Sequence, residues 1–309
     1  MQANRIMRKI AFGYSTRCNV KCEHCVAADA VPENLKMELP RAREIIAEMA
    51  AAYIQGISFT AGEPLIYLDE ITELVKLCHQ KYGIYTRVVS NCFWAKTPAL
   101  ADSYIVQLKE NGLSQLRMSF SRWHQKNIAR QNIVNAAQSC RKNGLDYFIS
   151  FVTDFSEQDD ACEDYLREHG FRFFPEPVIF AGRAGSFDRQ PIHTDYQANC
   201  CPMNPYLAPG LDMYACCDAG SHFTSTNFFH LGNLKDNTIE QLLQKSETNS
   251  LYNHIRKMGI TAIASFTGYK AREIIQYRKC ELCEKLFNSP DTLAMLQREA
   301  HAGQNFWYR

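Results

Sequence analysis

Short apolar segments alternate with amphipathic segments over the first 180 residues of the chain. The apolar segments are rich in Ile, Val and Phe and predict six strands, at 9–15, 57–60, 84–90, 113–120, 145–152 and 171–180. The amphipathic segments have a helical period and predict five helices, at 40–56, 67–83, 97–112, 125–144 and 156–170. Each strand–helix repeat spans roughly 30 residues, which is typical of βαβ units.

This alternation predicts an α/β fold with a parallel sheet and right-handed crossovers. Six units are fewer than a closed barrel needs, so we expect a partial (β/α)6 barrel with its chemistry at the carboxyl ends of the strands. After residue 180 the alternation stops, and residues 191–235 are rich in Pro, Asn, Gly and Cys. We therefore divide the chain into residues 1–185 and a smaller C-terminal domain, residues 186–309, built from a β-hairpin and helices such as 238–259.

Charge and composition argue against several classes of partner. The chain has 34 basic and 33 acidic residues, and no block of Lys or Arg that would indicate a nucleic acid or a membrane surface. The N-terminus lacks the apolar region of a signal peptide, and no apolar run is long enough to span a bilayer. We expect a cytoplasmic protein with neither nucleic acid nor membrane as a partner.

The chain has 13 cysteines, and in a reducing cytosol such a number indicates metal binding or catalysis rather than disulfides. Three of them, Cys18, Cys22 and Cys25, follow the first predicted strand with the spacing C-x3-C-x2-C. Three thiolates complete neither a tetrahedral zinc site nor a four-cysteine iron–sulfur cluster. Two arrangements remain: an iron–sulfur cluster with one open iron, or a zinc ion completed by His24 or a distant residue.

The cysteine loop, placed after the first strand of such a barrel, resembles that of the radical S-adenosylmethionine (SAM) superfamily. The resemblance implies a [4Fe-4S] cluster on Cys18, Cys22 and Cys25 whose open iron is chelated by SAM. It also implies reductive cleavage of SAM to a 5′-deoxyadenosyl radical that abstracts a hydrogen from the substrate. The family often has an aromatic residue before the third cysteine, where this chain has His24.

The segment "TAGEP" (60–64), after the second predicted strand, resembles the family's GGEP turn, with Ala61 in place of the first glycine. The resemblance implies a SAM-binding turn formed by Gly62, Glu63 and Pro64. In that turn, backbone carbonyls and the Glu63 carboxylate would hold the ammonium group of SAM.

Three further segments resemble SAM-binding segments of the family. In "VVSNCF" (88–93), Asn91 would lie near SAM, although Cys92 stands where the family has glycine. In "RMSFSRWHQ" (117–125), Ser119 would reach the SAM carboxylate or ribose, and His124 is a catalytic candidate at the mouth of the site, although the family's aspartate is absent. In "IFAGRAG" (179–185), Arg183 would meet the carboxylate of SAM or an acidic group of the substrate.

A second set of cysteines, in "CCPMNPYLAPGLDMYACCDAG" (200–220) and "CELC" (280–283), resembles the C-terminal extensions called SPASM and Twitch. No cysteine follows Cys283, which favours the shorter Twitch form with one auxiliary [4Fe-4S] cluster. The resemblance implies four ligands: Cys201, Cys216, Cys280 and Cys283. Cys200 and Cys217 are alternatives within the two doublets, and a zinc ribbon is the alternative to a cluster. A thiol left over at Cys217 is a catalytic candidate, as a donor of a hydrogen atom.

Three functions agree with these motifs. We favour modification of a ribosomally made peptide, by epimerisation or by thioether or carbon–carbon crosslinking. The second is oxidation or rearrangement of a small metabolite such as an aminoglycoside or a nucleotide, and the third is a non-enzymatic iron–sulfur electron carrier. The SAM-binding turn argues against the third, because a carrier needs no open iron. For either enzyme we expect a flavodoxin- or ferredoxin-type electron donor.

Overall fold

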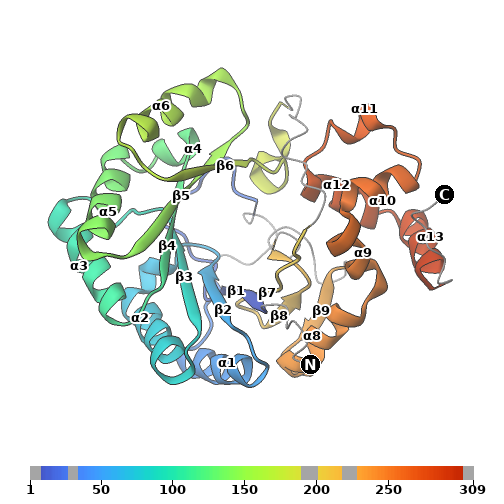
Figure 1. The fold of residues 1–309 in the computed structure, drawn as a ribbon, viewed down its shortest axis with the longest axis horizontal. Coiled ribbons are helices and arrows are strands. Elements are labelled where there is room, and N and C mark those ends of the chain that lie inside the picture. The colour runs from blue at the N-terminus through green and yellow to red at the C-terminus, as the bar shows by residue number, and fades with distance from the viewer. Residues whose placement is uncertain (1–7, 27–33, 189–200, 218–227, 302–309) are drawn as a thin grey trace, which may run out of the picture.

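A sheet of nine strands forms the centre of the computed structural model, which describes residues 8–26, 34–188, 201–217 and 228–301. The strands lie in the order β6-β5-β4-β3-β2-β1-β7-β8-β9. The first six pair in parallel, each with the next in sequence, and form an open arc in Figure 1. They are β1 (Lys9–Gly13), β2 (Gly56–Thr60), β3 (Tyr85–Ser90), β4 (Gln115–Phe120), β5 (Asp146–Thr153) and β6 (Phe173–Pro177). The predicted partial (β/α)6 barrel is confirmed.

Helices cover the outer side of this arc (Figure 1). They are α1 (Leu39–Ala51), α2 (Leu68–Lys76), α3 (Pro98–Glu110), α5 (Arg130–Asn143) and α6 (Asp160–Glu168). The short α4 (Arg122–Gln125) follows the carboxyl end of β4 and packs against residues 178–184. Side chains at alternate strand positions, such as Ile10 and Phe12 of β1, are buried in the core cluster beneath these helices. Ala11 and Gly13 therefore face the inside of the barrel, because successive strand residues point to opposite faces.

Two predicted helices are interrupted in the structure. The segment predicted as one helix at 125–144 forms the short α4, which begins after the N-cap Ser121, and then α5. The segment predicted at 238–259 divides at Asn249, whose side chain accepts a bond from Tyr252 N and so starts a new helix. At the second break a capping side chain ends the periodic pattern, whereas α5 begins after Ala129 without a side-chain cap.

The C-terminal part extends the same sheet. Strand β7 (Tyr206–Leu207) pairs in parallel with β1, and β8 (Asp212–Tyr214) and β9 (His230–Asn233) follow antiparallel. Six helices complete the described part: α8 (Ile239–Thr248), α9 (Ser250–Met258), α10 (Ile260–Phe266), α11 (Ala271–Ile274), α12 (Lys279–Phe287) and α13 (Pro290–His301). One core cluster includes buried side chains from β1 to α13. The division at residue 185 stays a prediction.

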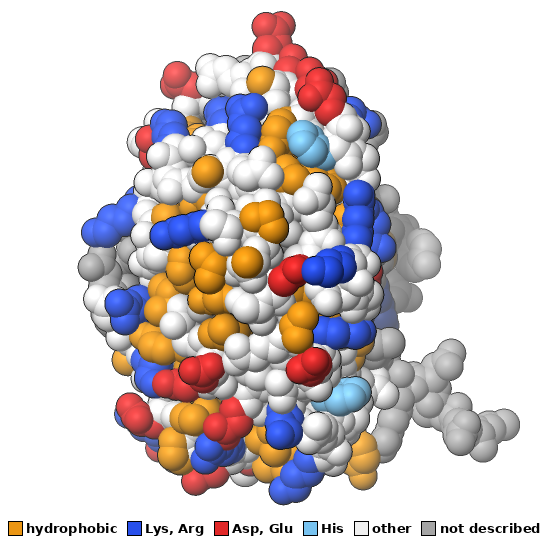
Figure 2. All heavy atoms as spheres, turned by 90° about the vertical axis from the view of Figure 1, so that its left-hand side faces the viewer, with side chains coloured by type: hydrophobic (Ala, Val, Ile, Leu, Met, Phe, Trp, Pro, Cys, Tyr) orange, Lys and Arg blue, Asp and Glu red, His pale blue; other side chains and the backbone are white. Residues whose placement is uncertain are grey.

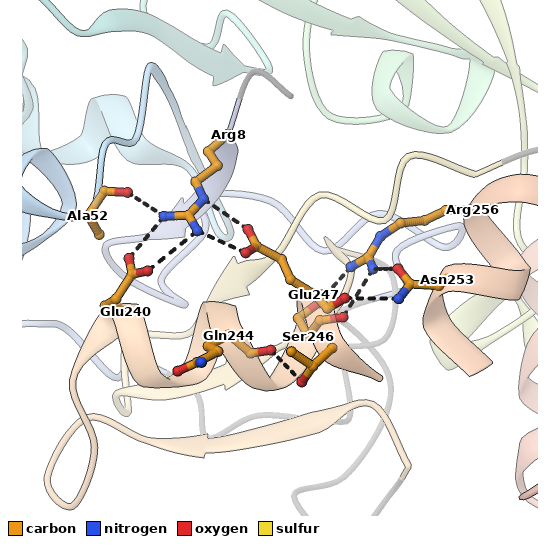
Figure 3. Close-up of polar contacts among 9 residues, drawn as sticks. Arg8, Ala52, Glu240, Gln244, Ser246, Glu247, Asn253 and Arg256 are labelled. Atoms are coloured by element: carbon orange, nitrogen blue, oxygen red, sulfur yellow. Dashed lines mark hydrogen bonds and ion pairs between the residues drawn. The ribbon is translucent and has the colours of Figure 1, made fainter. Parts of the chain in front are cut away.

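Arg8 joins the beginning of β1 to helix α8 (Figure 3). Its guanidinium donates two bonds of 2.8 Å to Glu247, further bonds to both oxygens of Glu240, and one of 2.7 Å to the carbonyl of Ala52. These bonds tie the first barrel strand, the end of α1 and the C-terminal helices together on the side of the barrel away from the strand ends that carry the chemistry.

Strand β6 is one of the two edge strands of the sheet, at the barrel end. Arg172 O accepts from Ile149 N, and Val178 N donates to Thr153 O, so the parallel ladder turns the backbone of residues 173, 175 and 177 away from β5. Two of these three are Pro175 and Pro177, which have no N–H. The edge therefore offers few donors to another strand, which protects it from unwanted pairing.

The outer helical face has acidic and basic side chains interspersed with apolar ones, and among the described residues no field of one sign covers it (Figure 2). Within the part of the chain that the structure describes, no helix is both long and apolar enough to cross a membrane.

Candidate active site

The three cysteines of the C-x3-C-x2-C motif lie on one loop at the carboxyl end of β1. Cys18 is exposed, Cys22 is buried, Cys25 is half-buried, and none of the three forms a disulfide. Cys25 N donates to Cys22 O at 3.2 Å, which folds the second and third cysteines into a turn. Residues 35–37 support the loop from the other side, through bonds from Thr16 N to Leu35 O and from Met37 N to Tyr14 O.

The surroundings of these thiols fit an iron–sulfur cluster. Burial raises the pKa of Cys18 to about 11 and that of Cys22 to about 12, and the charge of Cys25 adds to both shifts. The thiols therefore keep their protons until a metal displaces them. A four-iron cluster binds each thiolate on a different iron, so three thiols leave one iron open.

The turn "AGEP" packs directly against the cysteine loop. Ala61 and Gly62 have left-handed φ angles of 67° and 54°. A Cβ on Gly62 would overlap the carbonyl of Arg17, so only glycine allows this approach. Glu63 N donates to the same carbonyl at 2.8 Å. The predicted SAM-binding turn therefore lies beside the predicted cluster ligands, and Pro64 starts the short helix η1 (Pro64–Tyr67) that follows it.

The Glu63 carboxylate is committed to backbone donors. One oxygen accepts from Asn91 N at 2.7 Å, and the other accepts from Leu65 N at 3.1 Å. Burial raises the pKa of Glu63 to about 7, although these two bonds act in the opposite direction. The side chain therefore joins the ends of β2 and β3. Its predicted contact with the SAM ammonium group stays a prediction.

Asn91 reaches the cysteine loop. Its Nδ2 donates to Asn19 Oδ1 at 3.0 Å and lies 4.0 Å from Cys18 Sγ. The next residue, Cys92, has a φ of 61°, which explains why the similar family segment has glycine there. Asn91 thus lies beside the Cys18 thiol, which is a predicted ligand of the cluster. Its contact with SAM remains a prediction.

His24 and His124 pack together beneath the cysteine loop. The two rings lie 4.5 Å apart, and His24 stacks on Trp123 at 5.1 Å. Ser121 Oγ and His124 Nδ1 are 2.8 Å apart. Burial lowers the pKa of His24 to about 4 and holds that of His124 well below its usual range. His24 therefore acts as the aromatic residue that the motif usually has, and His124 is buried beneath it rather than exposed at the mouth.

Arg183 also contacts the cysteine loop. Its Nε donates to Cys22 O at 2.8 Å, and its backbone N–H donates to Cys25 O at 3.2 Å. Its predicted contact with a carboxylate of SAM or substrate stays a prediction. Ser119 is half-buried on β4, opposite Ser150 of β5, and its contact with SAM is likewise a prediction.

The sequence analysis missed a polar wall inside the barrel. Arg117 of β4 donates to Ser150 Oγ at 3.0 Å and pairs with Glu176 of β6. The guanidinium groups of Arg117 and Arg87 lie over the ring of Phe148, at 5.9 and 5.2 Å from its centre. The alternation of side chains along each predicted strand could have indicated this wall.

Three cysteines of the second set, Cys201, Cys216 and Cys283, pack against the core cluster that contains Tyr252 of α9. The charges of Cys216 and Cys283 both act on Tyr252, whose pKa burial and these thiols raise, while Cys201 acts on Arg256 one turn later. Cys280 and Cys283 lie one turn apart on α12. The charge of Cys217 acts instead on Tyr206. Cys200 lies outside the described residues. The grouping fits the proposed ligands, and the auxiliary cluster itself remains a proposal.

Comparisons with known proteins identify the class. The sequence profile of the Radical SAM superfamily matches residues 13–168, about half of the chain, and the chain belongs to this superfamily. It is 24% identical over 308 residues to "Putative peptide biosynthesis protein YydG" of Bacillus subtilis (strain 168), covering 93% of this chain and 94% of the relative. The chain is therefore a radical SAM enzyme with a [4Fe-4S] cluster and SAM as cofactors.

Two solved structures share the fold. Native anSMEcpe with bound AdoMet and Cp18Cys peptide has a TM-score of 0.58 and 14% identity, with 96% of both chains covered. BtrN in complex with AdoMet and 2-DOIA has a TM-score of 0.54 and 11% identity, with 84% of this chain and 91% of BtrN covered. Both likenesses extend beyond the barrel into the C-terminal part.

Proposed function

We propose that this radical SAM enzyme modifies a ribosomally made peptide, and that the modification is epimerisation of a residue in that peptide. A peptide substrate is supported by the similarity to a peptide biosynthesis protein and to a structure with a bound peptide. The observation that supports epimerisation is the position of Cys217.

Cys217 is exposed and follows β8 by three residues. Tyr214 of β8 pairs with Tyr206 of β7, and a Cβ on Gly13 would lie 2.5 Å from the Tyr206 hydroxyl. Gly13 ends β1 on the inner face, just before the cysteine loop. Ala61 of the SAM-binding turn packs against a small group of buried apolar side chains that includes Tyr206. A peptide lying over this turn therefore has a thiol near it.

A cluster held by Cys18, Cys22 and Cys25, with SAM bound, would supply a 5′-deoxyadenosyl radical able to remove one hydrogen atom from the Cα of the target residue. The Cys217 thiol then donates its hydrogen atom to the opposite face of the carbon radical, so the configuration inverts and the peptide keeps its composition. Cys217 is left as a thiyl radical, and it returns to the thiol by taking up one electron and one proton. An external flavodoxin- or ferredoxin-type protein supplies that electron.

The test uses the anaerobically reconstituted enzyme with SAM and dithionite in D2O, together with any short peptide that is encoded next to its gene. A thiol in D2O carries deuterium, so epimerisation is expected to add about one mass unit for each inverted residue, together with 5′-deoxyadenosine. Cys217→Ala should still form 5′-deoxyadenosine without deuterium in the peptide. A loss of about two mass units would instead indicate crosslinking, and an unchanged peptide would favour a small metabolite. Deuterium uptake by Cys217→Ala would remove this thiol from the mechanism.

A further inference from the structure

Residues 178–186, which follow β6, connect the two sets of cysteines, and we call this segment the strap. It contains the short helix η4 (Gly182–Ser186). One end of the strap contacts the loop of Cys18, Cys22 and Cys25, and the other contacts α12, which contains Cys280 and Cys283. These two sets of cysteines are more than 250 residues apart in sequence.

At the first end, the strap holds the cysteine loop through its backbone carbonyls. Arg183 bonds to the carbonyls of both Cys22 and Cys25. Gly182 has a φ of 56°, and a Cβ there would lie 2.6 Å from Val26 O and 2.8 Å from Cys25 O. The strap thus lies in van der Waals contact with the backbone that positions two of the three thiols.

At the second end, a buried carboxylate binds the strap to α12. Glu281 lies between the two cysteines of "CELC" and is only 5% exposed. One of its oxygens accepts from Phe180 N of the strap at 2.6 Å, and the other accepts from Arg278 N at 3.2 Å. A buried charged acceptor makes strong hydrogen bonds, so Glu281 fixes the start of α12 to the strap.

Arg278 reinforces this end. It is 3% exposed, and its guanidinium lies 5.7 Å from the ring centre of Phe180 and 5.2 Å from that of Phe155. Among the described residues its three guanidinium nitrogens have no hydrogen-bond acceptor. The side chain is therefore held by the two rings and by the charge of Glu281, so its position depends on that of the strap.

The middle of the strap is packed rather than loose. Val178, Phe180 and Ala184 are buried in one cluster with Trp123, whose ring stacks on His24 of the cysteine loop. A shift of Phe180 therefore reaches the cysteine loop through side-chain packing as well as through the backbone, because packed side chains transmit displacement.

We propose that the strap sets the position of the SAM-cluster loop according to the position of α12, with Glu281 as a positioning residue. The carboxylate of Glu281 bonds to Phe180 N of the strap and to Arg278 N at the start of α12. Changing Glu281 should weaken SAM binding at the first cluster. Within the proposed function, this link would align SAM with the proposed auxiliary cluster on Cys280 and Cys283 of α12. The proposal itself needs only the first cluster.

The test compares two glutamates with the same local role. Glu273 accepts a bond from Lys270 N at the start of α11, as Glu281 does from Arg278 N at the start of α12. Titration of SAM against the reduced enzyme, followed by the EPR signal of the [4Fe-4S] cluster, measures binding without any peptide. We expect Glu281→Gln to weaken SAM binding about fivefold, at the lower end of coupling between sites. Glu273→Gln should change it by less than about twofold.

A double mutant separates the strap from a direct contact of Arg183 with SAM. If Arg183 and Glu281 act through one strap, Arg183→Met combined with Glu281→Gln should weaken binding by clearly less than the product of the single effects. Equal SAM affinity in Glu281→Gln and Glu273→Gln would overturn the proposal, and so would effects that multiply. Urea denaturation of each variant checks that the chain is folded. Because no peptide is present, a failed peptide assay has no bearing on this result.

Discussion

Replacing Arg122 by Met should cost the protein several kcal/mol of stability. The Arg122 guanidinium donates to both oxygens of Asp154 at 2.6 and 3.0 Å, and it lies 2.6 Å from Asp159 Oδ1. The two carboxylate side chains are only 10% and 4% exposed. Removing the cation leaves two neighbouring buried carboxylates without their partner. Breaking buried pairs of this kind costs about 3–5 kcal/mol.

The cost should depend on pH in a defined direction. Burial alone would raise the pKa of Asp154, but bonds from Arg122 and Ser156 outweigh it and hold the pKa well below its usual range. A carboxyl group with a lowered pKa in the folded state adds stability above its ordinary pKa of about 3.9, and this stability is lost as the pH falls below that value. The difference between wild type and Arg122→Met should therefore be largest at neutral pH and shrink towards pH 3.

Urea denaturation of both proteins at several pH values measures this difference. Asp154→Asn in the Arg122→Met background serves as the control, because it removes one of the two unpaired charges and should recover part of the loss. A loss below about 1 kcal/mol, the value of an exposed ion pair, would refute the reasoning. A loss that does not change with pH would show that packing against Trp123, which lies 4.0 Å from the guanidinium, is the main contribution.

Three further predictions concern Gly62 beside the cysteine loop, the doublet Cys216–Cys217, and Arg8 between β1 and α8. Gly62→Ala should lower the iron content of the site formed by Cys18, Cys22 and Cys25, measured after reconstitution. The Cβ of the new alanine would overlap the carbonyl of Arg17 in the cysteine loop. Cys216→Ser should lower the iron content of the second site while Cys217→Ser leaves it unchanged, because Cys216 packs against the core as Cys201 and Cys283 do, whereas Cys217 is exposed. Arg8→Ala should lower the free energy of unfolding by about 1 kcal/mol, measured in urea, because its acidic partners are half exposed.

The sequence predicted the six barrel strands and the clustering of their loops because both follow from local pattern. Apolar alternation identifies a strand, and parallel strands bring their carboxyl ends together. The pairing of β7 with β1 was not predicted. It joins Tyr206 to Ala11 across almost 200 residues, and a strand of two residues has no period to recognise.

The hydrogen-bond partners of Glu63 and Arg183 could not be predicted from the spacing of the motifs. Motif resemblance placed Glu63 and Arg183 near SAM, and both lie at the correct end of the barrel. In the described chain both side chains bond to backbone groups: the Glu63 carboxylate accepts from Asn91 N, and the Arg183 guanidinium donates to Cys22 O. Those partners are 28 and 161 residues away, so only the folded chain reveals them. A motif predicts where such a residue lies, but its hydrogen-bond partners in the folded chain determine its role.

If Cys217 donates the hydrogen atom and Cys216 is a ligand of an auxiliary cluster, there is a physical reason for the two cysteines to be adjacent. Consecutive side chains point to different sides of the backbone, and here Cys216 acts on Tyr252 while Cys217 acts on Tyr206. A thiyl radical formed at Cys217 would then lie one residue from a ligand of the auxiliary cluster. The electron that restores the thiol could pass through that cluster with only a short step to the radical. A single separated cysteine would have to be brought near the cluster by the fold, whereas a doublet ensures this by covalent connection.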